Sequence, residues 1–192
     1  MSELTARQQQ ILNTSISIIA QEGIQNLTTK NLSAKISVSE AALYRHYDSK
    51  HSILMGILDM FKEFSEMPEI PDGKELSPVD KIELFLTDRY EKFSVKPDLA
   101  KVMFSEALFI NDKELSEKSR LIMHGHKEII VKFIKEGMKN GSINKDLDPV
   151  SVFRTIIGSM RLLVTQWCYN GNTFDLKKEG MKLWYNIKIM IQ

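Results

Sequence analysis

The side chains best suited to chemistry lie in residues 39–50, which read SEAALYRHYDSK. A phenol, a guanidinium and an imidazole follow one another at Tyr44, Arg45 and His46, and a primary amine follows at Lys50. All four groups donate hydrogen bonds to phosphate oxygens or to base edges. The pattern therefore indicates a contact with nucleic acid rather than covalent catalysis.

Two short helices are expected to present these side chains, one over residues 29–36 and one over residues 39–46. Helices of about two turns are marginal alone, so they need a supporting helix. The preceding segment supplies one, because its apolar residues recur on one helical face, at Leu12, Ile16 and Ile19. We predict a three-helix unit whose second short helix enters a major groove about 12 Å wide.

Helical spacing of apolar residues continues along the chain, and no segment alternates as a strand does. The sequence predicts an all-α fold of about nine helices, at residues 5–21, 28–35, 39–45, 49–66, 78–94, 97–110, 113–139, 149–169 and 174–190. Thr28, Ser39 and Ser49 are predicted N-caps, as is Asp148 before a proline. Three of the five prolines lie in the segment 67–78, which is expected to be a loop.

Bulk composition is that of an ordinary folded protein. The 192 residues are 43% hydrophobic and 27% charged, with 26 basic and 25 acidic side chains. Any attraction to DNA must therefore come from a local surface. The single cysteine, Cys168, excludes an internal disulfide, and we read it as a buried thiol or a dimer-interface residue. The N-terminal run MSELTARQQQ lacks the apolar core of a signal peptide, and no apolar run approaches the roughly 20 residues of a membrane span. We expect a cytoplasmic, nucleoid-associated protein with no membrane partner.

The stretch from residue 8 to residue 58 resembles the DNA-binding domain of the TetR family of repressors. The matching runs are LTTK at residues 27–30, LSAK at 32–35, VS at 38–39, and LYRHY from residue 43 with Lys50 after it. The resemblance implies a helix-turn-helix DNA-binding domain over residues 1–48. It implies a helical regulatory domain, for ligand binding and dimerisation, over residues 49–192.

The resemblance also assigns roles within the DNA-binding domain. It implies phosphate contacts from the aromatic and basic residues, base reading from the start of the recognition helix, and a variable, base-reading position at Arg45. The implied DNA-contacting residues are Thr29, Lys30, Ser39, Glu40, Ala41, Ala42, Tyr44, Arg45, His46 and Lys50. Tyr47 stands where the family usually has phenylalanine, and it is expected in the core.

One acidic residue departs from this pattern. Glu40 could accept a hydrogen bond from a cytosine amino group, or it could simply repel phosphate. Residues 1–50 carry five basic and four acidic side chains, which is weakly basic for a DNA-binding domain. We therefore expect modest non-specific affinity and tight binding only by a dimer.

For the remaining chain, the resemblance implies a homodimer formed by the last two helices and a pocket for a small-molecule effector. The predicted dimer residues are Val152, Phe153, Ile156, Met160, Leu163, Trp167, Leu183, Trp184 and Ile187, and the small residues Gly158, Ser159 and Gly180 would permit close helix contact. The candidate effector-binding residues are Phe61, Phe64, Phe85, Phe104, Leu108, Met123, Phe133, Met138, Met160 and Trp167, each of which could equally be ordinary core. Ten methionines favour a hydrophobic ligand.

Enzymatic function is not indicated. The sequence has no nucleophile–base pair, glycine-rich phosphate loop or metal-ligand spacing, so we expect no catalytic residue, metal or cofactor. His124 and His126 would lie on different faces of a helix, which does not suit a shared metal ion.

Two functions remain open at this point. The first is a repressor released from a palindromic double-stranded operator by a small, mainly hydrophobic effector, with the helix at 49–66 transmitting the change. The second is a DNA-bound interaction protein that responds to a protein partner, because the run SEAALYRH resembles that of the family's nucleoid-occlusion division inhibitors.

Overall fold

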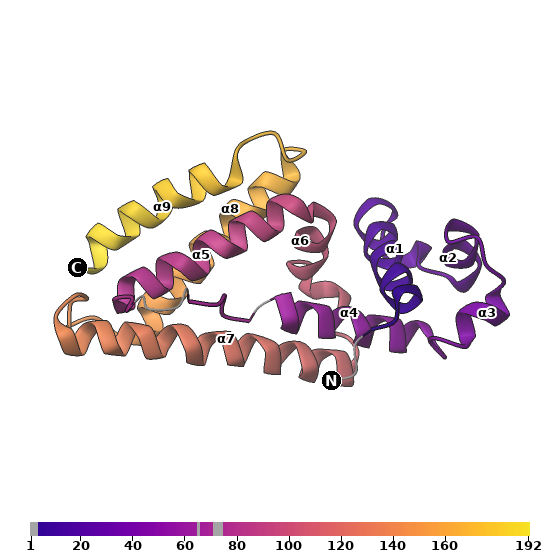
Figure 1. Ribbon diagram of the computed structural model, residues 1–192, viewed down its shortest axis with the longest axis horizontal. Helices are drawn as coiled ribbons and strands as arrows, with labels where there is room; N and C mark the ends of the chain where they lie inside the picture. The colour runs from indigo at the N-terminus through magenta and orange to yellow at the C-terminus, as the bar shows by residue number, and fades with distance from the viewer. Residues whose placement is uncertain (1–3, 65, 71–74) are drawn as a thin grey trace. The chain divides into compact units, whose positions relative to one another are not determined.

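The computed structural model describes residues 4–64, 66–70 and 75–192. Within these residues it contains nine α-helices, two 3₁₀ turns and no strand, which confirms the all-α prediction (Figure 1). The helices are α1 (Ala6–Glu22), α2 (Thr29–Lys35), α3 (Glu40–Tyr44), α4 (Lys50–Phe64), α5 (Pro78–Val95), α6 (Pro97–Met103), α7 (Lys113–Asn140), α8 (Pro149–Tyr169) and α9 (Leu176–Ile191). The 3₁₀ turns are η1 (Ile24–Asn26) and η2 (Glu106–Leu108).

The predicted N-caps all form. Thr28 and Ser39 accept the backbone N–H of the residue three positions on, at 3.1 and 3.2 Å. Ser49 does the same at 3.0 Å and Asp148 at 2.7 Å. Each cap satisfies a donor that the first turn of a helix leaves without an intrahelical partner. These caps are why the predicted and observed helix starts agree closely.

One predicted helix is wrong in its length. The segment 97–110 was expected to be continuous, but α6 ends at Met103 and a separate 3₁₀ turn follows. The Ser105 hydroxyl donates to the carbonyl of Lys101 at 2.7 Å, so a side chain takes the acceptor that the next helical amide would use. The predicted loop at 67–78 includes residues 71–74, which lie outside the described residues.

The chain divides into two units. The first comprises Met1–Phe64 and Asp98–Arg120, and the second comprises Ser65–Pro97 and Leu121–Gln192. Helix α4 therefore belongs with the N-terminal helices, and α7 begins in the first unit and ends in the second. The predicted functional division at residues 48 and 49 stays a prediction, because these units follow packing rather than function.

In the first unit, α1 is the central support. It packs against α2 and α4, and α2 packs against α3. Its apolar stripe is buried, with Leu12 fully inaccessible and Ile16 only 4% exposed. The stripe predicted from sequence is thus confirmed as the core of the three-helix unit.

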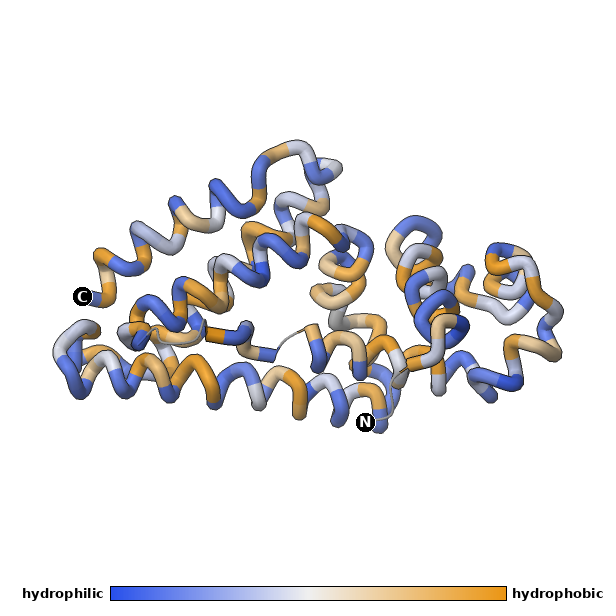
Figure 2. The backbone as a smooth tube through the Cα atoms, in the orientation of Figure 1, coloured by the Kyte–Doolittle hydropathy of each residue, from blue (hydrophilic) through white to orange (hydrophobic). Residues whose placement is uncertain are grey.

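In the second unit, α5 packs against α8 and α9, and these two helices pack against each other (Figure 1). Apolar and polar residues alternate with the helical period along all three helices (Figure 2). Both tryptophans are buried here with their indole N–H groups satisfied. Trp184 donates to Glu83 at 2.9 Å, and Trp167 donates to the carbonyl of Phe174 at 3.0 Å.

Gly180 lies at the closest approach of α9 to α5. A Cβ atom placed on it would come within 2.5 Å of three ring atoms of Tyr90, which is itself 1% exposed. The close helix contact that Gly180 was expected to allow therefore occurs inside the protomer. None of the helices in the described residues is long and apolar enough to cross a lipid bilayer.

We predict that Gly180→Ala destabilises the protein by about 1–3 kcal/mol, because the buried ring of Tyr90 cannot move away without disturbing the core. Thermal unfolding followed by circular dichroism should show a fall in Tm of several degrees. Gly125→Ala, in α7, is the matched control. A Cβ there meets nothing within 4 Å, so this variant should be neutral or slightly more stable. Equal Tm values for the two variants would contradict the packing described here.

Candidate DNA-binding surface

Helix α3 is held by a single buried side chain. Leu43 is 1% exposed and is the only buried residue of the helix. Its neighbour Tyr44 is 50% exposed, and Arg45 and His46 beyond it are exposed as well. The predicted recognition helix therefore presents its aromatic and basic residues to solvent.

The turn between α2 and α3 sets the direction of α3 relative to α2. Ser37 adopts a left-handed conformation with a φ of 57°, which non-glycine residues adopt only at some cost. The amide of Val38 then donates to the carbonyl of Ser33 at 3.0 Å, closing the end of α2. Ser39 caps α3 directly after this turn, so the first turn of α3 follows α2 with little freedom.

The first residues of the two short helices are joined by a hydrogen bond. The Thr29 hydroxyl, at the start of α2, donates to Glu40 Oε2, at the start of α3, with the oxygens 2.6 Å apart. Glu40 is exposed, and so is Ala41 beside it, whereas Ala42 is half-buried. The structure thus brings together three residues that were predicted to read bases and one predicted to touch DNA from α2.

Lys50 begins α4, and its position is also fixed. Its ammonium donates to the carbonyl of Ile24 in η1 at 2.7 Å, while the residue remains exposed. An ammonium has three donors, so two remain for a phosphate. Lys30 and Arg45 are exposed.

Tyr47, expected in the core, is half-buried. Its ring lies against Gly56 of α4, with the hydroxyl 3.3 Å from the position a Cβ on that glycine would take. Burial, helped by the charge of Asp59, raises the pKa of Tyr47. The side chain thus supports the contact between the end of α3 and α4 rather than facing DNA.

Comparison with known proteins supports this geometry. The model of bacterial regulatory proteins of the tetR family matches residues 11–55, and the model of the YsiA-like protein C-terminal region matches residues 59–189. The chain belongs to the TetR family. It is a TetR-type DNA-binding transcriptional regulator, and residues 11–55 contain the helix-turn-helix described above.

Three relatives of this TetR-family chain are informative. The fatty acid metabolism regulator protein of Bacillus subtilis is 23% identical over 177 residues, which cover 92% of this chain and 91% of the relative. The nucleoid occlusion factor SlmA of Aliivibrio fischeri is 32% identical over 99 residues, half of each chain. The solved structure of the regulator FadR from Bacillus subtilis with stearoyl-CoA matches with a TM-score of 0.81 at 22% identity, covering 96% of this chain and 99% of that one.

The predicted effector-binding residues are divided between the two units. Phe61, Phe64, Phe104 and Leu108 belong to the first unit, and the others belong to the second. Phe61 meets Phe109 edge to face, with ring centroids 6.0 Å apart. Met160 and Trp167 are buried in the core of the second unit, and Met123 is 53% exposed. The assignment of these residues to an effector pocket therefore stays a prediction.

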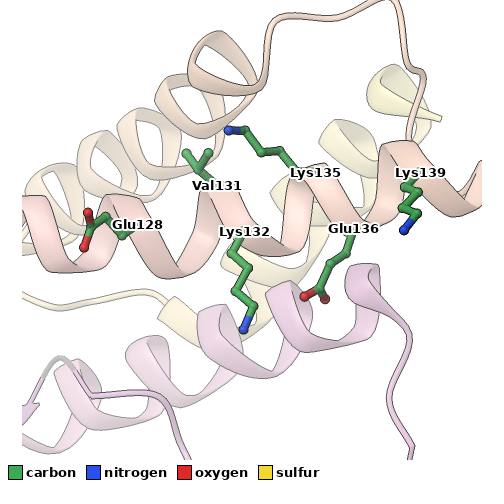
Figure 3. Close-up of a pocket in the computed structure, with 6 residues that line it drawn as sticks. All are labelled: Glu128, Val131, Lys132, Lys135, Glu136 and Lys139. Atoms are coloured by element: carbon green, nitrogen blue, oxygen red, sulfur yellow. The ribbon is translucent and has the colours of Figure 1, made fainter.

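A hollow of about 460 Å³ lies along one face of α7 (Figure 3). In this view Lys132 and Glu136 point downward from that face, and Val131 and Lys135 point upward from it. None of the predicted effector residues lines it. Its walls are mostly charged, which does not suit the hydrophobic effector expected from the sequence. The lining residues are Glu128, Val131, Lys132, Lys135, Glu136 and Lys139.

The predicted dimer residues mostly face the interior of the protomer. Six of the nine are buried in the second unit, where α8 and α9 pack against each other and against α5. Phe153, Leu163 and Leu183 are half-buried. The outer faces of the same two helices carry a different apolar set, comprising Leu162, Tyr169, Tyr185, Ile189 and Met190, each at least 58% exposed.

A buried charge in the second unit was not predicted from the sequence. Arg89 is 2% exposed, donates to the carbonyl of Glu66, and lies over the Phe85 ring at 4.6 Å from its centroid. It also pairs with Asp88 at 3.0 Å. Burial, together with the charge of Arg89, lowers the pKa of His126 to about 4. His126 is therefore neutral at pH 7.

We predict that Lys50→Ala weakens binding to every DNA sequence by about tenfold, because it removes a charge-assisted contact to phosphate. The slope of log affinity against log salt should fall by about one per protomer. Lys35→Ala is the control, because the exposed Lys35 pairs with Glu22 at 2.8 Å and is not a predicted DNA contact. Unchanged affinity and slope for Lys50→Ala would contradict the assigned role.

A second prediction concerns acid stability. The pKa of His126 lies near 4 in the folded chain and near 6.5 when unfolded, so the unfolded chain binds more protons between these values. Stability should therefore fall as the pH drops from about 6.5 to about 4. In His126→Gln, the Tm should fall less over this range, whereas His124→Gln, an exposed position in the same helix, should follow the unsubstituted chain. Identical Tm profiles for the two variants would show that His126 does not contribute.

Proposed function

We propose that the protein is a ligand-responsive repressor that binds a palindromic operator as a homodimer and is released by a long-chain fatty acyl thioester. The observation that carries the proposal is the match, over almost the whole of both chains, to a regulator of fatty acid metabolism. A solved neighbour of the same extent holds stearoyl-CoA, a ligand with a long apolar chain. A mainly hydrophobic effector was also expected from the residue types.

Contacts within the first unit offer a route by which an effector would act on α4. His51 Nε2 lies 3.4 Å from Asp112 Oδ1 and 3.5 Å from Glu114 Oε2, near the start of α7. One turn into α7, Lys118 pairs with Asp59 at 2.7 Å and donates to the carbonyl of Met55 at 3.0 Å. Helix α7 continues into the second unit, so a shift of α7 would be transmitted to α4 and to Lys50 at its start.

The homodimer is proposed to form through the outer faces of α8 and α9. Their exposed apolar residues, among them Leu162 and Tyr185, would be covered by the same faces of a second copy. Two recognition helices in such a dimer would meet half-sites about 34–36 Å apart, or a multiple of that. We propose no catalytic role, metal or cofactor, and we place the protein in the cytoplasm on the nucleoid.

The test is footprinting of the purified protein on the DNA upstream of its own gene, followed by titration with stearoyl-CoA. We expect protection of a palindrome and loss of protection as stearoyl-CoA is added, with free coenzyme A as the control that lacks the apolar chain. Protection that resists acyl-CoA esters of every chain length would contradict the proposed effector. If the protein protects none of the DNA fragments tested, operator binding is contradicted.

The match to the nucleoid occlusion factor favours a second candidate, a DNA-bound protein that responds to a protein partner. That match covers only half of each chain, whereas the match to the metabolic regulator covers more than nine-tenths. A partner that co-purifies with the DNA-bound protein, together with indifference to acyl thioesters, would favour this candidate.

A further inference from the structure

The hydrogen bond between Thr29 and Glu40 has a fixed direction. A carboxylate only accepts hydrogen bonds, so the Thr29 hydroxyl must supply the proton across the 2.6 Å separation. A hydroxyl has one proton, and phosphate oxygens are also acceptors. While this bond exists, Thr29 cannot donate its hydroxyl to DNA. The contact with DNA that family resemblance implies for Thr29 stays a prediction, and it would require this bond to break.

The bond also restrains Glu40 on the exposed side of α3. Glu40 lies three residues before Leu43, the buried anchor of the helix, and its backbone follows the Ser39 cap. One carboxylate oxygen accepts the hydrogen bond from Thr29. The other oxygen can accept a hydrogen bond from a DNA base. A free glutamate samples several rotamers and must be ordered on binding, whereas this one is already held. A carboxylate held in this way is suited to reading a base.

The chemistry of the major groove limits what such a carboxylate can read. Guanine offers acceptors at N7 and O6, and thymine offers an acceptor at O4, so both repel it. Adenine places the N7 acceptor beside its N6 donor, whereas cytosine presents only the N4 amino donor. A fixed, acceptor-only group therefore favours cytosine.

We propose that Glu40 determines specificity by selecting a cytosine at one position of each half-site, and that Thr29 is the positioning residue that holds it. The inference rests on the proposed binding of operator DNA through α3. It resolves the two roles that the sequence left open for Glu40, because a carboxylate that only repelled phosphate would gain nothing from being held.

The experiment is selection of bound duplexes from a random-sequence library with the full-length chain and four variants. The unsubstituted chain should enrich one cytosine per half-site. Glu40→Ala should lose that preference by about fivefold or more, and Glu40→Gln should shift it toward adenine, which an amide can contact through both N6 and N7. Thr29→Val should weaken the cytosine preference several-fold without lowering the slope of log affinity against log salt. Thr29→Ser keeps the hydroxyl and should restore the preference.

Measurements of affinity against salt separate this account from its alternatives. If Thr29→Val instead weakens binding to all sequences and lowers the salt slope by about one, Thr29 contacts phosphate and the proposal is overturned. If Glu40→Ala strengthens binding to all sequences equally, Glu40 only repels DNA and the proposal is again overturned. An enriched palindrome whose bases do not respond to Glu40→Ala overturns this inference alone. Failure of the unsubstituted chain to enrich any sequence would overturn operator binding and the inference together.

Discussion

Helix α3 has five residues, and Leu43 is its one buried side chain. A helix of this length does not form alone in water, because it fixes many dihedral angles for few hydrogen bonds. The burial of Leu43, the Ser39 cap and the hydrogen-bonded turn at Val38 together supply what the helix lacks. The exposed residues of α3, Glu40 and Tyr44 among them, depend on this anchorage, because the register of the helix decides which side chains face outward.

Much of this arrangement could be predicted from the sequence, because it is local. The caps at Thr28, Ser39 and Ser49 directly precede their helices. The spacing of Leu12 and Ile16 is enough to predict which face of α1 is buried. The exposure of Tyr44 follows from its position next to a buried leucine. Features that depend on residues far apart in sequence were missed. The bond from Thr29 to Glu40 spans eleven positions and that from Lys50 to Ile24 spans 26.

In the second unit, the helical spacing of apolar residues predicted which faces are buried but not what they pack against. The stripe that includes Val152 and Ile156 was read as a surface for a second copy, yet it packs inside the protomer. An apolar stripe indicates that a helix face is buried, but it does not say against which partner. The buried charge of Arg89 illustrates the same limit. Its local contacts, with Asp88 beside it and with the Phe85 ring one turn earlier in α5, do not explain its burial. Its bond to the carbonyl of Glu66, 23 residues away, depends on tertiary packing, which the sequence pattern does not reveal.

The contact of Lys50 with the Ile24 carbonyl has a consequence for how long a complex with DNA would last. A lysine side chain ordinarily loses the freedom of four rotatable bonds when its ammonium settles on a phosphate. Here the ammonium is already tied to the backbone of η1, so that freedom is lost when the chain folds. A phosphate bound to this ammonium would contact two segments of the protein through one nitrogen, because Lys50 and Ile24 are 26 residues apart. The DNA would leave when the bond between ammonium and phosphate breaks. The lysine would then stay in place, ready to bind the phosphate again.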